Sequence, residues 1–136
     1  MIASEDVATV NAWPRQALHA FNEIHLGPYT NTPIGVLAKM GDQVIGGIYG
    51  GVLLGWLAVE QVFLDEQYRG QGLGRQMMNA IEAEAKRLGA RRAFVDTASF
   101  QAEGFYAKCG YQVWGRFTDF APGVDRIYMR KDDLGV

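Results

Sequence analysis

The sequence predicts an α+β fold built on one mixed sheet, and two observations predict it. Short apolar runs separated by glycine-rich turns occur near both ends of the chain, as in antiparallel hairpins. Between them, a strand-like run at 52–64 precedes an amphipathic helix pattern at 73–88 and a further apolar run at 93–97, which is the order of a βαβ unit. Antiparallel hairpins around one such unit give a mixed, mostly antiparallel sheet.

The sequence pattern of the N-terminal half predicts a helix followed by a series of strands. Apolar residues recur at helical spacing from Ser4 to His25, with Ser4 as the expected N-cap. Pro14 predicts either a break or the first turn of a second helix, and Gly27-Pro28 ends the pattern. Strands are expected at 34–40, 44–49 and 52–64, with a turn at Gly41-Asp42 and a turn or bulge at Gly50-Gly51.

The C-terminal part predicts two helices and three strands. The helix at 73–88 carries Met77, Met78 and Ile81 on one stripe and stops at Gly89. A strand is expected at 93–97, a short helix at 101–109, and two final strands at 111–120 and 126–130 around a turn at 121–123.

Composition limits the class of protein. The chain has 136 residues, of which 49% are hydrophobic, so a single domain over residues 1–136 is expected. With a net charge of −2, the chain lacks the excess of positive charge that is typical of a nucleic-acid-binding protein, so a nucleic-acid partner is not expected. Cys109 is the only cysteine, which excludes an intrachain disulfide, and His19 and His25 have no partner at metal-ligand spacing, so no metal site is expected. No apolar run approaches the roughly 20 residues of a membrane span, and no secretory leader pattern begins the chain, so the cytoplasm is the expected location.

The segment from Arg69 to Arg75, Arg-Gly-Gln-Gly-Leu-Gly-Arg, predicts a site for a pyrophosphate. Its three glycines let the backbone approach a bulky anion and tolerate positive φ, and the helix that follows supplies unpaired N–H donors and the positive end of its dipole. A P-loop is excluded, because Gly74 is followed by Arg75 and Gln76 rather than by Lys and a hydroxyl residue. The spacing Gly-x-Gly-x-Gly also fits a dinucleotide fingerprint poorly, although Asp96 lies about twenty residues on.

The loop resembles the signature of the GNAT superfamily of acetyl-CoA-dependent N-acetyltransferases, Arg/Gln-x-x-Gly-x-Gly/Ala. Gln67-x-x-Gly70-x-Gly72 and Arg69-x-x-Gly72-x-Gly74 match it in two overlapping registers. Downstream, Phe105-Tyr106-Ala107-Lys108-Cys109-Gly110-Tyr111 is similar to a second segment of that superfamily, Phe-Tyr-x-x-x-Gly-Phe/Tyr. The stretch from Asp96 to Ala102 resembles a group of small bacterial single-domain members, and the whole resemblance runs from about Val36 to Met129.

The resemblance implies a fold, a cosubstrate and a reaction. It implies a central mixed sheet with helices on both faces, acetyl-CoA or CoA as cosubstrate without a metal, and direct transfer of the acetyl group to a primary amine of a small molecule or a terminal amino group. A homodimer is a further expectation. The residues expected to bind the cosubstrate are Val62, Phe63, Leu64, Arg69, Gly70, Gln71, Gly72, Leu73, Gly74, Arg75 and Phe105.

Two side chains are expected to move protons. An alkylamine with a pKa near 10.4 is scarcely nucleophilic at neutral pH, so a base or a water chain must take its proton. Glu60, a polar residue in an apolar strand, is the first candidate base, and Asp96, Asp65 and a water chain are the alternatives. By resemblance, backbone N–H groups around Phe63 and Leu64 hold the thioester oxygen, and Tyr106 protonates the leaving thiolate.

Two other functions stay open at this level. One is a catalytically silent CoA-binding domain with a regulatory role. The other is a toxin-like enzyme that acetylates aminoacyl-tRNA, which the acidic net charge disfavours.

Overall fold

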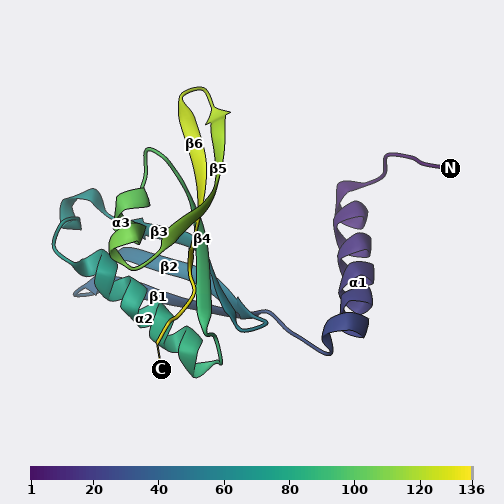
Figure 1. Cartoon of the computed structure of the whole chain (residues 1–136), viewed down its shortest axis with the longest axis horizontal. Coiled ribbons are helices and arrows are strands. Elements are labelled where there is room, and N and C mark those ends of the chain that lie inside the picture. The colour runs from purple at the N-terminus through teal and green to yellow at the C-terminus, as the bar shows by residue number, and fades with distance from the viewer. Residues whose placement is uncertain (136) are drawn as a thin grey trace. The chain divides into compact units, whose positions relative to one another are not determined.

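The computed structural model describes residues 1–135 of the chain. These residues divide into two compact units, one over residues 1–30 and one from Asn31 onward, and each unit is described by itself (Figure 1).

The first unit contains one long helix, α1 (Val7–Leu26). The helix begins after Asp6, whose carboxylate accepts a hydrogen bond from the backbone N–H of Thr9 at 3.0 Å, and it ends at Gly27 with φ 76°. The predicted N-cap at Ser4 and the predicted break at Pro14 are therefore both wrong. Proline inside a helix removes one backbone hydrogen bond, and here α1 continues through it without interruption.

The second unit is built on a six-stranded sheet with the strand order β1-β2-β3-β4-β6-β5. Only β3 and β4 run parallel; every other neighbouring pair is antiparallel. The strands are β1 (Thr32–Met40), β2 (Gln43–Leu53), β3 (Trp56–Leu64), β4 (Arg92–Ala98), β5 (Gln112–Ala121) and β6 (Val124–Lys131). The α+β class and the mixed, mostly antiparallel sheet are thus confirmed.

The predicted strand at 52–64 is in fact the end of one strand, a tight turn and the start of the next. Leu54 and Gly55 have φ values of 53° and 84°, and Leu53 pairs with Trp56 across them. Two consecutive residues with positive φ are typical of a two-residue hairpin turn. Gly50-Gly51, the expected position of a turn or bulge, lies inside β2.

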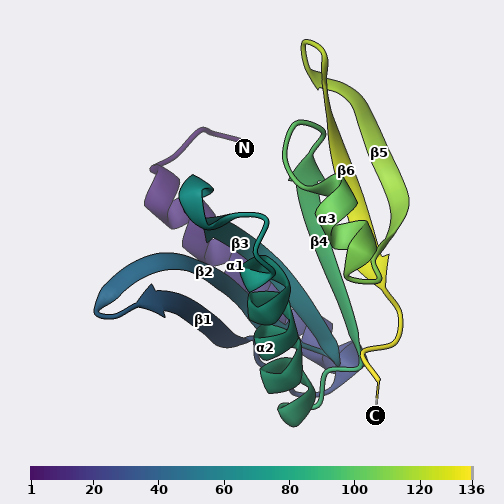
Figure 2. The same cartoon turned by 90° about the vertical axis from the view of Figure 1, so that its left-hand side faces the viewer.

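Two α-helices and a 3₁₀ turn complete the second unit. The turn η1 (Glu66–Tyr68) and the helix α2 (Leu73–Arg87) follow β3, and the short helix α3 (Glu103–Lys108) follows β4. Both helices pack on the same face of the sheet, because Met78 and Ile81 of α2 and Tyr106 of α3 belong to one core cluster with Leu57 and Ile127 (Figure 2). We call this the helix face.

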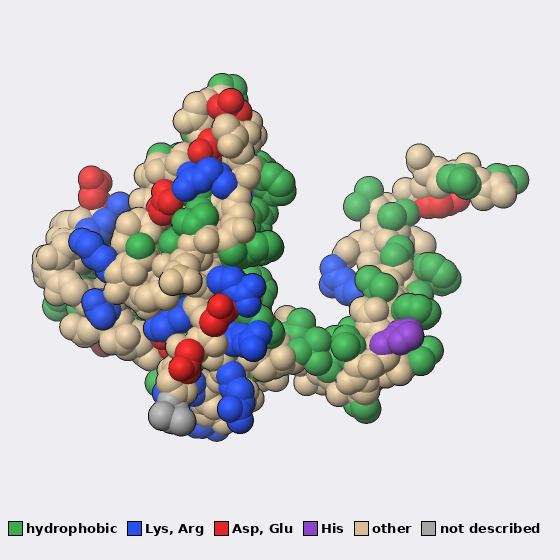
Figure 3. Space-filling model, viewed as in Figure 1, with side chains coloured by type: hydrophobic (Ala, Val, Ile, Leu, Met, Phe, Trp, Pro, Cys, Tyr) green, Lys and Arg blue, Asp and Glu red, His purple; other side chains and the backbone are tan. Residues whose placement is uncertain are grey.

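The other face of the sheet, which we call the open face, carries no helix from residues 31–135. Alternate residues of each strand point toward it, so that buried Val95 alternates with exposed Phe94 on β4, and buried Val59 alternates with half-buried Ala58 on β3. Figure 3 shows a column of apolar side chains along the β5–β6 side of this unit. Trp114, Phe117 and Phe120 are each more than half exposed there.

A buried polar cluster joins α2 to the last two strands. Glu82 is 7% exposed and accepts hydrogen bonds from the hydroxyl group of Tyr111 at 2.8 Å and from Nζ of Lys131 at 2.9 Å. The Glu82 carboxylate together with burial raises the pKa of Tyr111, and burial is the larger cause. Within residues 1–135, no helix combines the length and the hydrophobicity that crossing a membrane requires.

Candidate active site

The glycine-rich loop lies between η1 and α2 and has the backbone geometry of an anion-binding turn. Gly70 and Gly72 have φ values of 79° and 86°, and a Cβ atom on either would have no heavy atom within 4 Å, so the space above both residues is open. Gly72 is the N-cap of α2 and offers no side chain to cap the helix. In the described chain, the first backbone N–H groups of α2 are therefore left for a ligand.

Gly74, the third glycine, has a different role from the first two. A Cβ atom at this position would lie 3.1 Å from the ring of Phe105, so the glycine allows α3 to pack closely against the first turn of α2. The two sequence motifs therefore contact each other directly. Phe105, an expected cosubstrate residue, thus lies beside the loop.

The two arginines that flank the loop are placed differently. The Nε atom of Arg69 donates to the carbonyl oxygen of Leu64 at 2.8 Å, and its guanidinium lies 5.5 Å from the ring centroid of Phe63. Arg69 thus holds the end of β3. Arg75 makes no ion pair with any described residue, and its charge lowers the pKa of Cys109, although burial raises that pKa more. Arg75 is the cation of the loop that is available to a phosphate.

The parallel strands β3 and β4 part beyond the middle of the sheet. Their register runs from Trp56 opposite Arg92 to Val59 opposite Val95 and stops there, although β3 continues to Leu64 and β4 to Ala98. Figure 2 shows the two strands diverging toward their C-terminal ends. The edge of β3 that faces β4 therefore has no strand partner over Val62 to Leu64, although Arg69 already occupies the carbonyl oxygen of Leu64.

Glu60 lies at the point where the strands part. The register between β2 and β3 pairs Tyr49 with Gln61 and Gly50 with Val59, so Glu60 is the extra residue of a β-bulge. The bulge explains why both Glu60 and Gln61 are exposed while the alternating Leu57 and Val59 are buried. Glu60 follows Ala58 on the open face, and its carboxylate has no hydrogen-bond or ion-pair partner in residues 1–135.

The alternative bases are placed less favourably or farther along the strand. The carboxylate of Asp96 accepts a hydrogen bond from Nε of Arg126 at 2.8 Å and forms an ion pair with the same guanidinium. The negative charge of Asp96 is therefore paired with the positive charge of Arg126. Asp65 follows the end of β3, where it caps η1 without a side-chain hydrogen bond. Of the acids near the diverging strands, Glu60 is thus the unpaired carboxylate on the strand itself.

Tyr106 has a buried ring and an accessible oxygen. The residue is 4% exposed, and its ring packs against Phe105 and Tyr111 at centroid distances of 5.3 and 6.0 Å. Its hydroxyl group makes no hydrogen bond, yet no fully buried side-chain oxygen or nitrogen of residues 1–135 lacks a partner. The oxygen of Tyr106 therefore keeps contact with solvent. Burial, followed by Cys109 and Asp96, raises the pKa of Tyr106 to about 12.

The predicted catalytic residues approach the diverging strands from opposite faces of the sheet. Tyr106 belongs to the core of the helix face, and Glu60 lies on the open face. Pairing between β3 and β4 ends at Val59 and Val95, next to Glu60.

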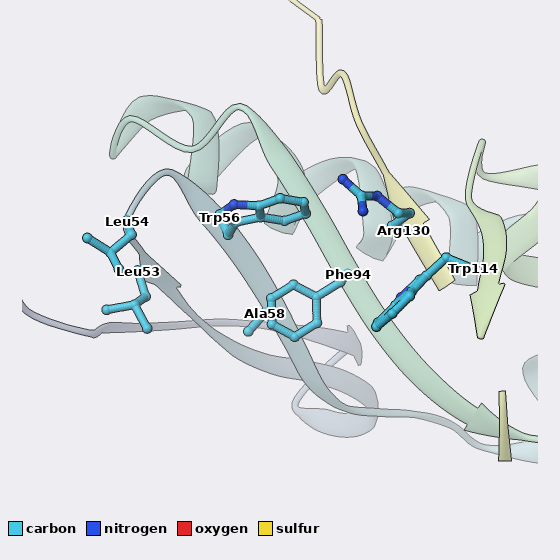
Figure 4. Close-up of a pocket in the computed structure, with 7 residues that line it drawn as sticks. All are labelled: Leu53, Leu54, Trp56, Ala58, Phe94, Trp114 and Arg130. Carbon is cyan, nitrogen blue, oxygen red and sulfur yellow. The ribbon is translucent and has the colours of Figure 1, made fainter. Parts of the chain in front are cut away.

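Sequence reasoning missed an aromatic hollow on the open face. A cavity of about 330 Å³ is lined by Leu53 and Leu54 at the β2–β3 turn, Trp56 and Ala58 of β3, Phe94 of β4, Trp114 of β5 and Arg130 of β6 (Figure 4). Figure 4 shows the ring of Phe94 between Ala58 on one side and Trp114 on the other, with the ring of Trp56 above them. The signal was present in the sequence as apolar residues alternating on β3 and β4, but only the strand register shows that they share a face.

Comparisons with known proteins agree on one family. A family profile described as the acetyltransferase (GNAT) family matches residues 2–111. The chain is 36% identical over 91 residues to a blasticidin-S acetyltransferase of Streptomyces morookaense, which covers 66% of this chain and 67% of the relative. A crystal structure of an acetyltransferase from Bacillus cereus superposes with a TM-score of 0.87 at 25% identity, covering 96% of each chain. A streptothricin acetyltransferase of Bacillus anthracis, crystallised with acetyl coenzyme A, has the same fold, with a TM-score of 0.67 at 21% identity over 76% of this chain and 64% of that chain.

Proposed function

Because the chain belongs to the GNAT family and is therefore an acetyl-CoA-dependent acyltransferase, we propose that it moves the acetyl group to a primary amine of a small molecule. The observation that carries this proposal is the unpaired carboxylate of Glu60 in a bulge where β3 and β4 part. The relative named a blasticidin-S acetyltransferase supports a small-molecule acceptor.

The residues fit the cosubstrate. Gly70 and Gly72 leave open space beside unpaired N–H groups, and Arg75 supplies a free positive charge for the pyrophosphate. The edge of β3 over Val62 to Leu64 has no strand partner on the β4 side, and it suits the amides of an extended pantetheine chain and the thioester oxygen. These groups would position acetyl-CoA without a metal.

The reaction then needs two proton movements. Deprotonating an alkylamine at neutral pH costs roughly 4 to 5 kcal/mol, and Glu60 takes that proton directly or through water. The neutral nitrogen attacks the thioester carbon, the C–N bond forms, and the negative charge on the oxygen is held by backbone N–H groups near Phe63 and Leu64. The C–S bond breaks, and Tyr106 donates its proton to the sulfur and recovers one from solvent.

Glu60→Gln tests the role of the base. The variant keeps the shape and the position of the side chain but cannot take a proton, so kcat falls by about 10²-fold while the Kd of CoA stays unchanged. The rate of the variant should recover as pH rises toward the pKa of the amine. Thiol release from acetyl-CoA across a panel of primary amines is the measurement.

Asp96→Asn is the matched control for the Glu60 variant. It removes the other carboxylate near the strands and also frees Arg126. If Asp96→Asn loses the rate and Glu60→Gln does not, the base is Asp96. If the parent binds CoA but acetylates no amine at all, the catalytically silent alternative replaces the proposal.

Two further expectations remain proposals. The homodimer is tested by sedimentation of the full chain, in which a single species of twice the mass of 15.0 kDa supports it. The cytoplasmic location is tested by fractionation of cells that produce the protein.

A further inference from the structure

We infer that the acceptor is a monoamine whose nitrogen is joined to a flat apolar ring by a chain of two or three atoms, with the ring bound in the aromatic hollow beside Glu60. This inference rests on the proposed function and names the class of amine. Four observations carry it: the shape of the hollow, its distance from Glu60, the charges around it and the composition of its walls.

The hollow has the size and the walls of a site for one ring. Its volume of about 330 Å³ lies at the lower end of the range for small-molecule sites. The rings of Trp56 and Phe94 meet edge to face at a centroid distance of 5.8 Å, and the small side chain of Ala58 lies beside the Phe94 ring. Phe94 is 42% and Trp114 is 61% exposed, so an aromatic ligand would bury apolar surface that the second unit leaves open.

The position of the hollow fits the length of the chain in such an amine. Ala58 lies two residues before Glu60 on the same strand and the same face, which corresponds to about 6.6 Å along the strand. Leu53, Leu54 and Trp56 line the hollow farther from Glu60. The ring must therefore bind at the Ala58 end, where a nitrogen two or three atoms away lies beside the Glu60 carboxylate. A simple alkylamine would reach Glu60 but leave the hollow empty.

The charges around the hollow favour a single positive charge on the ligand. The Glu60 carboxylate is unpaired, whereas the Asp96 carboxylate forms an ion pair with Arg126. The guanidinium groups of Arg92 and Arg130 lie 5.4 and 5.2 Å from the ring centroid of Trp56, at the end of the hollow away from Glu60. Arg130 is paired with Asp132 at 2.6 Å, and Arg92 has no acid partner in the described residues.

The charges around the hollow predict which classes of amine are good acceptors and which are poor ones. A second positive charge on the ligand would meet Arg92, so polyamines and polycationic antibiotics are poor fits. A carboxylate on the carbon next to the amine would lie close to Glu60, so an aromatic amino acid should be a worse acceptor than the amine that lacks its carboxylate. The best probe on these grounds is 2-phenylethylamine.

A second hollow on the same face offers the competing position for the ring. Leu37, Tyr49, Gln61 and Phe63 line it, together with the carboxylate of Asp65. Its walls mix apolar and polar side chains, and an acid stands at its rim. A polar or dicationic amine would suit that hollow better than an apolar ring does, so the two hollows predict different acceptors.

The experiment compares acceptors and variants in the full chain. Values of kcat/KM are measured for 2-phenylethylamine, butylamine, phenylalanine and spermidine with acetyl-CoA. Calorimetry then measures binding of 2-phenylethylamine to the CoA-loaded protein, in which no acetyl group is available. Phe94→Ala tests the aromatic hollow, Leu37→Ala tests the second hollow, and Phe117→Ala is the matched control, an exposed aromatic residue of the open face outside both cavities.

The expected result is a kcat/KM for 2-phenylethylamine at least tenfold above that for the other three amines. Phe94→Ala should remove most of this advantage and weaken calorimetric binding about tenfold, while the rate with butylamine changes little and Phe117→Ala behaves as the parent. Butylamine or spermidine accepted as well as 2-phenylethylamine overturns the inference and leaves the proposed function standing. A loss in Leu37→Ala instead of Phe94→Ala also overturns it.

Failure of the proposed function is separable from failure of this inference. If no amine is acetylated although CoA binds, the proposed function fails. Calorimetry still decides whether 2-phenylethylamine binds to the CoA-loaded protein and whether Phe94→Ala abolishes that binding. Absence of binding in the parent overturns the inference by itself.

Discussion

Tyr106 shows how one residue can serve both the core and the reaction. Its ring fills the space between Phe105 and Tyr111, while its oxygen has no hydrogen-bond partner and stays in contact with solvent. With a pKa of about 12, the hydroxyl group keeps its proton at every pH at which an acetyltransferase is assayed. A residue that only filled the core would have no need of the hydroxyl group.

Tyr106→Phe separates the two roles. Phenylalanine keeps the ring and its buried area, and the lost hydroxyl group has no partner to leave unsatisfied, so stability should change by less than about 1 kcal/mol. Loss of the proton donor should lower kcat by about 10²-fold with little change in the KM of acetyl-CoA. A cosubstrate analogue with a better leaving thiol should rescue the variant more than the parent. A kcat within twofold of the parent, without such rescue, would assign Tyr106 to packing alone.

In the glycine-rich loop, the backbone conformation of Gly72 and the predicted binding of CoA can be tested with one substitution. Gly72 has φ 86° and open space around its missing Cβ, so Gly72→Val introduces backbone strain and places a branched side chain over the N-terminus of α2. The strain costs about 1–2 kcal/mol. The side chain should abolish the thermal stabilisation by CoA, which is about 2.7 kcal/mol at a hundredfold excess over the Kd.

Gly89→Val is the control for strain in the same element. Gly89 follows α2 at its other end, has φ 95° and also has no heavy atom within 4 Å of its missing Cβ. Both variants should therefore lose similar stability, while only Gly72→Val loses the shift caused by CoA. If CoA raises the Tm of both variants and of the parent by the same amount, the pyrophosphate does not bind at Gly72.

The elements differ in how far sequence alone could predict them. Glycine spacing and residue order were sufficient for the turn that precedes α2 and for α2 itself, because local backbone chemistry determines both. The turn at Leu54-Gly55 was missed because leucine rarely adopts positive φ, and the break at Pro14 was predicted from a local rule that α1 does not obey. The face shown by Glu60 depends on a bulge that only pairing with β2 defines, and the aromatic hollow depends on the register of four strands.

At the scale of the whole molecule, the hydrophobic core and the predicted cosubstrate site both belong to one part of the chain. The core cluster extends from Ile34 to Leu134, and the loop, the bulge and α3 all lie between them. The C-terminal end is fixed by a hydrogen bond from the N–H of Leu134 to the carbonyl oxygen of Arg91 at 2.9 Å. All members of this cluster lie in the second unit.

A chain limited to residues 31–136 should therefore fold and bind CoA. Its far-ultraviolet circular dichroism should show the sheet and a cooperative thermal transition, because every buried apolar side chain of the core is retained. The thermal shift caused by CoA at a hundredfold excess over the Kd should match that of the full chain, since the glycine-rich loop and the edge of β3 over Val62 to Leu64 are unchanged. Acetyl transfer is a separate measurement on the same sample, and a loss of kcat with an intact CoA shift would assign α1 to the acceptor or to the catalytic step. An unfolded product, or a folded product without the CoA shift, would show that residues 1–30 contribute to the core or to the cosubstrate site.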